Sequence, residues 1–398
     1  MSVSLSAESR LIEPGGIRGA PLRVAALIDT VQVSGPGRQL AALAASLEAR
    51  GVELRVVMFH RAGRAPSPFL EYLDRAGVGY WVLEERGPFD IRLVSKVRRL
   101  FREWAPDVVQ THGYKPTALA YLLRRGGARW PWIAFFHGDT RENLKVRLYH
   151  WLDARLLGAA DRVIVMSQLH RERMSKLGDR VRVVHNACIP LPADAAAGGA
   201  HNEHADGGPR IGVVGRLSPE KGVDVFLRAC RELVSRDVPF TAVVAGDGPD
   251  RAQLEQLRDS LGLTSRVAFL GAVDAVHALY ASLDLLVIPS LSEGLPNVLL
   301  EALRADVPVV ATRVGAVPEV VTSREVGVVV PPGSSSALAE GVVAALPLKD
   351  DPVAREARRA IVERFSVERR AAHHLELYSA LCPRRVEIAS PSVETVLS

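Results

Sequence analysis

Short apolar runs rich in β-branched residues alternate with longer amphipathic stretches through the first half of the chain. Strands separated by helices pair in parallel, so this alternation predicts a parallel sheet covered by helices on both faces. The predicted helices include Pro36–Arg50, Ile91–Trp104 and Arg141–Gly158. The predicted strands are Leu22–Ile28, Val52–Phe59, Val78–Leu83, Asp107–Thr111, Trp132–His137, Arg162–Met166 and Val181–His185.

The alternation stops at residues 190–209, where six Ala, four Gly and three Pro leave no periodic apolar face. We interpret this segment as a linker. Strands are predicted again at Arg210–Gly215, Phe240–Ala245, Arg266–Phe269, Asp284–Pro289, Val307–Thr312 and Gly327–Val330. Helices are predicted at Gly222–Arg236, Asp250–Leu261, Ala275–Ser282, Asn297–Ala305 and Ser335–Leu346, and the end, Asp351–Leu381, is helical and Arg-rich.

The predicted fold class is therefore α/β, with two doubly wound, Rossmann-like domains facing across a cleft. Ligands of such sheets bind at the carboxyl ends of the strands, so the cleft is the expected site. We expect flexible tails at 1–21 and 383–398, domains at 22–189 and 210–365 joined by the linker 190–209, and a final helix at 366–382.

Composition and charge narrow the class of protein. The 398 residues carry a net charge of +5, but residues 22–190 hold 27 Lys and Arg against 16 Asp and Glu. A basic module suggests an anionic partner, either a membrane surface, a phosphorylated substrate or nucleic acid; the alternative is a general Arg-rich bias. Three distant cysteines exclude a disulfide framework and a four-ligand zinc site. We expect neither a membrane span nor a secretory signal, and a cytoplasmic, reducing location.

The segment Gly215–Gly222 carries the first candidate chemistry. It follows a strand and opens a helix, and its two cations, Arg216 and Lys221, flank a Ser-Pro turn. Two cations beside the amides of a helix amino end match a diphosphate. The alternative is a pair of solvated surface cations.

A second segment, Pro289–Glu301, also joins a strand to a helix, with Pro296 suited to the first helical position. Its amides can face an anion, and the carboxylates of Glu293 and Glu301 can each accept hydrogen bonds from a pair of sugar hydroxyls. One would hold a hexose and the other a ribose. Alternatively, Glu293 only complements the helix dipole and Glu301 pairs with a nearby Arg.

These two segments, with Gly246-Asp247-Gly248-Pro249 and Phe269-Leu270-Gly271 between them, resemble glycosyltransferase family 4, retaining nucleotide-sugar enzymes of GT-B fold. The resemblance implies that Arg216 and Lys221 neutralise the donor diphosphate. It implies that Glu293 holds the transferred sugar and Glu301 the ribose. The amides of Gly294 and Leu295 would support sugar and phosphate, and Val273 would meet the base through its backbone.

In the first half, Ser34-Gly35-Pro36-Gly37 resembles the family's glycine-rich loop, with Gly35 and Gly37 near the phosphates and the acceptor. His137 resembles the active-site histidine near the sugar; alternatively it is a structural residue. His112 and Lys115 end a strand on the cleft side and are candidates for acceptor contact. The final helix resembles the family's crossover onto the first domain.

Two positions depart from the family pattern. Pro36 interrupts the usual Gly-Gly pair, which leaves the acceptor side less defined than the donor side. Asp306 stands where a helix-ending Gly is common, and because Asp tolerates the left-handed conformation we expect only modest strain.

No Asp-x-Asp motif occurs, so we expect no metal and no cofactor, with the two cations offsetting the leaving group instead. The acceptor's proton would pass to the departing phosphate on the same face, or a covalent glycosyl-enzyme would form; the sequence leaves both open.

The leading hypothesis is transfer of a hexose or N-acetylhexosamine to a hydroxyl of a glycan or lipid-linked acceptor. The alternatives are a sugar-nucleotide epimerase or hydrolase and a non-catalytic sugar-nucleotide-binding protein. The basic helix Ile91–Trp104, with Phe101 and Trp104, suggests peripheral contact with anionic lipid at the inner face of the membrane; the alternative is a solvated helix face. No motif suggests a nucleic-acid partner.

Overall fold

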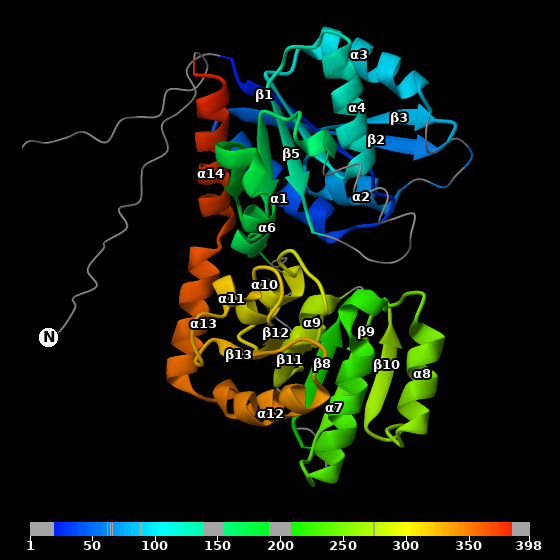
Figure 1. The fold of residues 1–398 in the computed structure, drawn as a ribbon, viewed down its shortest axis with the longest axis vertical. Helices are drawn as coiled ribbons and strands as arrows, with labels where there is room; N and C mark the ends of the chain where they lie inside the picture. The colour runs from blue at the N-terminus through cyan, green and yellow to red at the C-terminus, as the bar shows by residue number, and fades with distance from the viewer. Residues whose placement is uncertain are drawn as a thin grey trace, which may run out of the picture.

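The computed structural model describes residues 20–61, 63, 65, 67–87, 90–138, 155–190, 208–273 and 275–383. Most of each predicted tail, of the predicted linker and of the predicted helix Arg141–Gly158 lies outside these residues. The chain forms two lobes (Figure 1). We call them the N-terminal lobe, built on the first sheet, and the C-terminal lobe, built on the second.

Seven parallel strands form the sheet of the N-terminal lobe, and six form that of the C-terminal lobe. The first sheet has the order β3 (Tyr80–Glu85), β2 (Val52–Arg61), β1 (Leu22–Ile28), β4 (Val108–His112), β5 (Trp132–Phe136), β6 (Arg162–Val165) and β7 (Val181–Val183). The second has the order β10 (Val267–Gly271), β9 (Thr241–Ala245), β8 (Arg210–Val214), β11 (Leu285–Ile288), β12 (Val309–Thr312) and β13 (Gly327–Val330).

Both faces of each sheet are covered at its centre, which explains why the central strands are largely apolar, whereas the edge strands β3 and β10 keep exposed side chains. Along β1, Val24 and Ala26 pack in a core cluster with α1 residues, whereas Ala25 and Leu27 pack with α3 and α4 residues. The N-terminal lobe has helices α1 (Gly35–Glu48), α2 (Pro68–Arg75), α3 (Arg92–Trp104), α4 (Tyr114–Arg125) and α6 (Gln168–Arg173). The C-terminal lobe has α7 (Val223–Ser235), α8 (Arg251–Ser260), α9 (Val276–Ala281), α10 (Asn297–Arg304), α11 (Val317–Val320) and α12 (Ser335–Ala345).

The strand order confirms the α/β, doubly wound fold class. In each sheet the order reverses beside the first strand, between β1 and β4 and between β8 and β11. Ligands of such sheets bind outside the carboxyl ends of the strands at this reversal. We therefore expect a ligand-binding or catalytic site in the loops that follow these four strands.

The helical stretch Asp351–Leu381 consists of two helices, α13 (Pro352–Arg364) and α14 (Val367–Leu381), and the second lies at the final helix expected at 366–382. Ser366 caps α14 because its side chain accepts a hydrogen bond from the Arg369 amide. At this break the Cys188 amide donates to the Phe365 carbonyl at 2.7 Å. Helix α14 then runs alongside α1 of the N-terminal lobe (Figure 1).

Two further local predictions are settled by the backbone. Asp306 is in the left-handed conformation with φ of 57°, as predicted for the residue that ends α10. Pro296 is the N-cap of α10 rather than its first residue, because its ψ of 124° is extended and the helix begins at Asn297. Among the described residues, no helix combines the length and apolar character needed to cross a bilayer.

Candidate functional site

The loop after β8 carries Arg216 and Lys221 and is held by glycine contacts. Lys221 ends a single 3-10 turn, Pro219–Lys221, before α7 begins. Gly222, which joins the 3-10 turn to α7, has φ of 62°, and a Cβ on it would lie 2.2 Å from the Pro289 carbonyl oxygen. Only glycine fits both constraints. The loop after β8 therefore packs directly on the loop after β11.

The motif Gly246-Asp247-Gly248-Pro249 supports this loop from the other side. A Cβ on Gly246 would lie 1.8 Å from the Gly215 carbonyl oxygen, and one on Gly248 would lie 2.2 Å from that of Leu217. The Leu217 amide donates to the Asp247 carbonyl at 2.9 Å. This motif thus fixes the backbone from which Arg216 projects.

Arg216, Lys221 and Glu293 line one pocket at the strand-order reversal of the second sheet. The Lys221 Nζ donates to Glu293 Oε1 at 2.6 Å, and the hydroxyl of Ser290 donates to the same oxygen at 2.8 Å. The pocket has a volume of about 20 Å³, the space of one water molecule. A ligand larger than a water molecule fits this pocket only if its lining residues move.

The carboxylate of Glu301 is held from both lobes. Arg38, in the first turn of α1, lies 2.7 Å from Glu301 Oε1, and the Tyr280 hydroxyl donates to Glu301 Oε2 at 2.9 Å. Arg38 was absent from the predicted site. The sequence offers one local sign of the role of Arg38, its position directly after the glycine-rich loop. It does not show the partner, Glu301, which lies in the other half of the chain.

The two lobes touch where the glycine-rich loop meets the amino end of α10. A Cβ on Gly35 would lie 2.6 Å from Asn297 Nδ2, so the lack of a side chain makes room for Asn297. The Asn297 Oδ1 accepts hydrogen bonds from Gln39 at 3.1 Å and from Asn186 at 2.9 Å. Gly37 lies elsewhere, against the ring of Phe69.

A second contact joins the lobes at His137. A Cβ on Gly294 would lie 2.4 Å from the His137 carbonyl oxygen. The structure thus brings His137 beside the loop that holds Glu293. Leu295, next in that loop, is buried, and its carbonyl accepts from the Asn186 side chain at 3.0 Å. Val273 packs partly buried against the core.

The imidazoles of His112 and His137 contact each other, with 3.1 Å between His112 Nδ1 and His137 Nε2. Burial, and then the guanidinium of Arg370, lower the pKa of His137 to about 4. Burial also holds the pKa of His112 well below its usual range. Both rings are neutral near pH 7, so the pair can share one hydrogen bond without charge repulsion.

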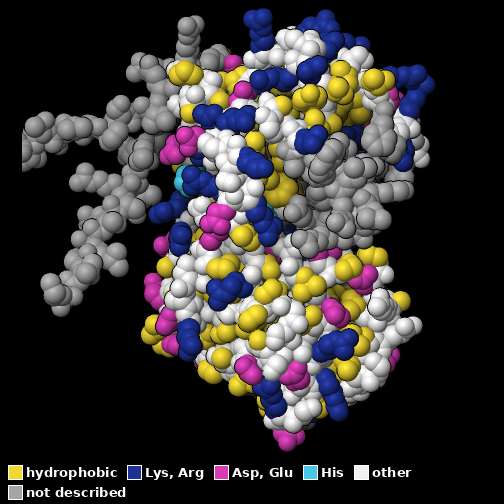
Figure 2. Space-filling model, in the orientation of Figure 1, with side chains coloured by type: hydrophobic (Ala, Val, Ile, Leu, Met, Phe, Trp, Pro, Cys, Tyr) yellow, Lys and Arg dark blue, Asp and Glu magenta, His cyan; other side chains and the backbone are white. Residues whose placement is uncertain are grey.

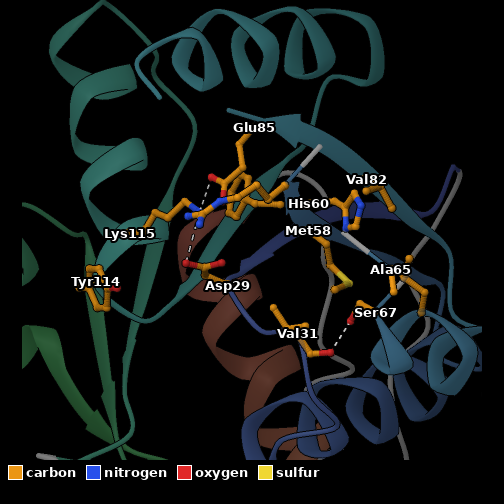
Figure 3. Close-up of a pocket in the computed structure, with 13 residues that line it drawn as sticks. Asp29, Val31, Met58, His60, Ala65, Ser67, Val82, Glu85, Tyr114 and Lys115 are labelled. Carbon is orange, nitrogen blue, oxygen red and sulfur yellow. Dashed lines mark hydrogen bonds and ion pairs between the residues drawn. The ribbon is translucent and has the colours of Figure 1, made fainter. Parts of the chain in front are cut away.

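Lys115 occupies a different part of the N-terminal lobe. Its Nζ lies 2.6 Å from Glu85 Oε2 and 3.3 Å from Asp29 Oδ2 (Figure 3). These residues line a pocket that shares no residue with the one around Arg216. Neither Asp29 nor Glu85 was predicted, because each is a single acidic residue at a strand end with no motif around it.

The aromatic side chains of helix α3, which the sequence suggested for membrane contact, pack against other rings of the N-terminal lobe. Phe101 is buried, with its ring 5.8 Å from that of Trp130, so it is not available to a membrane. Trp104 packs edge-on against Trp81 at 4.8 Å. The exposed side chains of α3 are chiefly basic, namely Arg92, Arg98, Arg99 and Arg102. Figure 2 shows Lys and Arg side chains gathered on this part of the N-terminal lobe.

Comparison with known proteins agrees with this arrangement. Residues 33–188 match the family described as Glycosyltransferase Family 4, and residues 208–347 match that described as Glycosyl transferases group 1. The chain is 30% identical over 324 residues to the phosphatidyl-myo-inositol mannosyltransferase of Mycobacterium leprae, covering 76% of this chain and 81% of the relative.

Two other similarities are more limited. The chain is 36% identical over 180 residues to the 2-deoxystreptamine glucosyltransferase of Streptomyces kanamyceticus, covering 44% of this chain and spanning less than half, 46%, of that relative. The solved structure of HepE from Anabaena in complex with UDP and glucose has a TM-score of 0.74 and 23% identity. It covers 90% of this chain and 100% of that chain, and the likeness is one of fold.

Proposed function

The chain belongs to glycosyltransferase family 4, and from that premise we propose a retaining, metal-independent transfer of a hexose or N-acetylhexosamine. The donor is a nucleotide diphosphate sugar, and the acceptor is a hydroxyl of a glycan or lipid-linked saccharide. The observation that carries the proposal is the convergence of Arg216, Lys221 and Glu293 in one pocket at the strand-order reversal. The UDP and glucose named with the Anabaena structure support this type of donor.

In this proposal Arg216 and Lys221 stabilise the negative charge that develops on the leaving diphosphate. The bond between the sugar's anomeric carbon and the diphosphate oxygen breaks, and its electron pair stays on the diphosphate. Arg216 and Lys221 face that developing charge, and preorganised cations at such a position are usually the largest catalytic contribution. Lys221 must first release Glu293, which then accepts hydrogen bonds from the sugar hydroxyls.

The acceptor oxygen bonds to the anomeric carbon on the face that the leaving group vacates. Its proton passes to the departing phosphate oxygen, so the enzyme needs no separate base for this step. His137 is neutral and lies at the Gly294 loop, where its role is to orient the sugar rather than to remove the proton. Glu301 holds the ribose in place of Arg38 once the donor is bound.

A thermal-shift screen of UDP-, GDP- and ADP-sugars tests the donor proposal. A donor at about 100 times its Kd stabilises the protein by about 2.7 kcal/mol. Product analysis then separates transfer from the alternatives: donor turnover without acceptor favours an epimerase or hydrolase, and binding without turnover favours a non-catalytic protein. Retention is checked from the anomeric configuration of the product by NMR.

We also propose that α3 contacts an anionic membrane peripherally at its inner face. Its exposed arginines support this, because basic side chains near anionic lipid each contribute about 1 kcal/mol at low salt. Flotation with anionic and with neutral liposomes tests it. Binding only to anionic vesicles, lost at high salt, is expected; equal recovery with both kinds of vesicle would contradict the proposal.

A further inference from the structure

The side-chain amide of Asn297 lies where the two lobes meet, at the first residue of α10. Its Oδ1 accepts hydrogen bonds from Gln39 Nε2 at 3.1 Å and from Asn186 Nδ2 at 2.9 Å. Its Nδ2 faces Gly35 of the glycine-rich loop. The two ends of this amide therefore have different surroundings, and the oxygen end is the one that holds the lobes together.

The orientation of the amide is fixed by partners that can act in only one way. Gln39 Oε1 accepts from the backbone amide of Ala187 at 2.8 Å and from the guanidinium of Arg370, which are both obligate donors. Gln39 Nε2 must then donate, to the Ala187 carbonyl at 2.7 Å and to Asn297. Asn186 Nδ2 also donates to a backbone carbonyl, at 3.0 Å. Two donors thus meet the same atom of Asn297, which must be its oxygen.

The nitrogen end of Asn297 is left with two N–H groups. Within the described part of the chain, Nδ2 has no hydrogen-bond partner. Asn297 and Gly35 are both partly exposed, so a ligand between the lobes can reach this nitrogen. A Cβ on Gly35 would lie 2.6 Å from Nδ2, so the glycine keeps the space beside the N–H groups open. The arrangement matches a ligand group that accepts hydrogen bonds.

The first turn of α1, opposite this amide, offers few N–H groups of its own. Pro36 has none. The backbone amides of Gly37 and Arg38 both donate to Ser34, at 3.2 and 2.9 Å, as part of the α1 cap. Asn297 therefore adds N–H donors beside a loop in which Pro36 removes one.

Asn297 stands midway between the two carboxylates of the proposed donor site. Glu293 comes four residues before it, and Glu301 comes four residues after it, about one turn along the same face of α10. In the proposed function Glu293 holds the transferred sugar and Glu301 the ribose, so the diphosphate that joins them passes Asn297. Val298, the next residue, lines the pocket that contains the two candidate cations.

We infer that Asn297 is a donor-binding residue whose Nδ2 donates a hydrogen bond to an oxygen of the donor diphosphate. The inference rests on the proposed function. Phosphate oxygens are charged acceptors, which suits a nitrogen that carries two N–H groups and no lone pair to offer. The oxygen end of the same amide keeps its contact with Gln39 and Asn186 while the ligand is bound.

Calorimetry with the full chain tests the inference. The ligands are whichever of UDP, GDP and ADP the unmodified protein binds and the corresponding nucleoside, which lacks phosphate. Asn297→Asp keeps an oxygen for Gln39 and Asn186 but replaces the N–H groups with a second acceptor. Asn297→Ala removes both ends of the amide. Ser336→Asp adds the same charge at an exposed position of α12 and is the control.

We expect Asn297→Asp to raise the Kd of the nucleoside diphosphate about 10- to 100-fold, because a hydrogen bond to a charged group is lost. The Kd of the nucleoside stays unchanged, and Ser336→Asp binds both ligands like the unmodified protein. A loss in Asn297→Ala without one in Asn297→Asp would show that the side chain only joins the lobes, and it would overturn the inference. An equal loss for nucleoside and nucleoside diphosphate would do the same.

The unmodified protein reports separately on the proposed function. If it binds none of the three nucleoside diphosphates, the proposed function itself fails, and the inference fails with it. If it binds one of them and Asn297→Asp binds it equally well, only the inference fails. The two failures are therefore distinguishable.

Discussion

The guanidinium of Arg38 and the carboxylate of Glu301 lie 2.7 Å apart, and they belong to different lobes. Their side chains are 33% and 13% exposed, so the pair is screened only in part by solvent. Because the second oxygen of Glu301 accepts from the Tyr280 hydroxyl, both carboxylate oxygens have a protein partner in this structure. Under the proposed function, donor binding exchanges this inter-lobe contact for a ligand contact.

Glu301→Gln tests the ribose assignment. We expect the Kd of the preferred nucleoside diphosphate, measured by calorimetry, to rise about 10- to 100-fold, because hydrogen bonds to a charged group are weakened. The matched control is the 2′-deoxy form of the nucleotide, which lacks one ribose hydroxyl. We expect it to bind the unmodified protein more weakly, and we expect Glu301→Gln to weaken its binding little further. An equal loss for both nucleotides would remove the ribose assignment.

Lys221→Ala tests the leaving-group assignment. Loss of one preorganised cation is expected to lower kcat by about 100- to 1,000-fold. Lys176→Ala, at an exposed position of the N-terminal lobe, is the control and leaves kcat unchanged. A chelator likewise leaves the rate unchanged. A loss smaller than about fivefold in Lys221→Ala, or a clear metal requirement, speaks against the mechanism.

Gly294→Ala tests the contact between the lobes. The added methyl group would lie 2.4 Å from the His137 carbonyl oxygen, so the loop or the lobe must shift. Since misplacement of about 1 Å can cost about 100-fold, we expect kcat/KM to fall at least tenfold while the far-UV spectrum is retained. Gly87→Ala, where a Cβ has nothing within 4 Å, is the control. Equal activity in both variants would show that the contact is dispensable.

The buried histidines predict a loss of stability in acid. Burial lowers the pKa of His137 to about 4 and that of His374 to about 3, against about 6.5 when unfolded. The unfolded chain therefore binds more protons in this window, so stability is present above pH 6.5 and is lost as the pH falls toward 4. Denaturant titrations measure this slope. His374→Gln flattens it and the exposed neighbour His373→Gln does not; identical slopes would exclude His374 as a source.

Asp306→Gly tests whether backbone strain at residue 306 or its ion pair with Arg358 has the larger effect on stability. Glycine relieves the left-handed conformation by about 1 kcal/mol, but it removes the carboxylate 2.8 Å from the buried Arg358. Arg358 is fully buried and then relies on its hydrogen bond to the Leu348 carbonyl, so we expect the lost ion pair to outweigh the strain relief and to give net destabilisation in denaturant unfolding. Asp306→Asn keeps the conformational tolerance and isolates the charge. A more stable Gly variant would show that strain dominates.

Much of the fold could be predicted because most strands are buried on both faces and most helices have one apolar side, whereas the edge strands β3 and β10 keep exposed side chains. Element boundaries shifted by one or two residues, as at β3, where Tyr80 rather than Val78 begins the strand. The final helix expected at 366–382 corresponds to α14, which begins after its N-cap Ser366. That boundary came from the family resemblance, because the apolar periodicity of Asp351–Leu381 alone does not mark the break.

The candidate site was predictable only where its signal was local. Arg216, Lys221 and Glu293 follow adjacent parallel strands, so their convergence followed from topology. Arg38 could not be assigned, because its partner is fixed by how the lobes meet. The left-handed Asp306 was predictable from its position at a helix end, but its pairing with Arg358 was not.

Helix α14 joins the N-terminal lobe to a segment far along the chain. Tyr378 lies fully buried beside Gln110 of β4, which is 268 positions earlier in the sequence, so α14 completes the core of a lobe whose strands are synthesised long before it. Domains generally fold as they emerge, the amino-terminal one first. Here part of the apolar surface of the N-terminal lobe stays uncovered until α14 has been synthesised, so we expect truncation before α14 to favour aggregation.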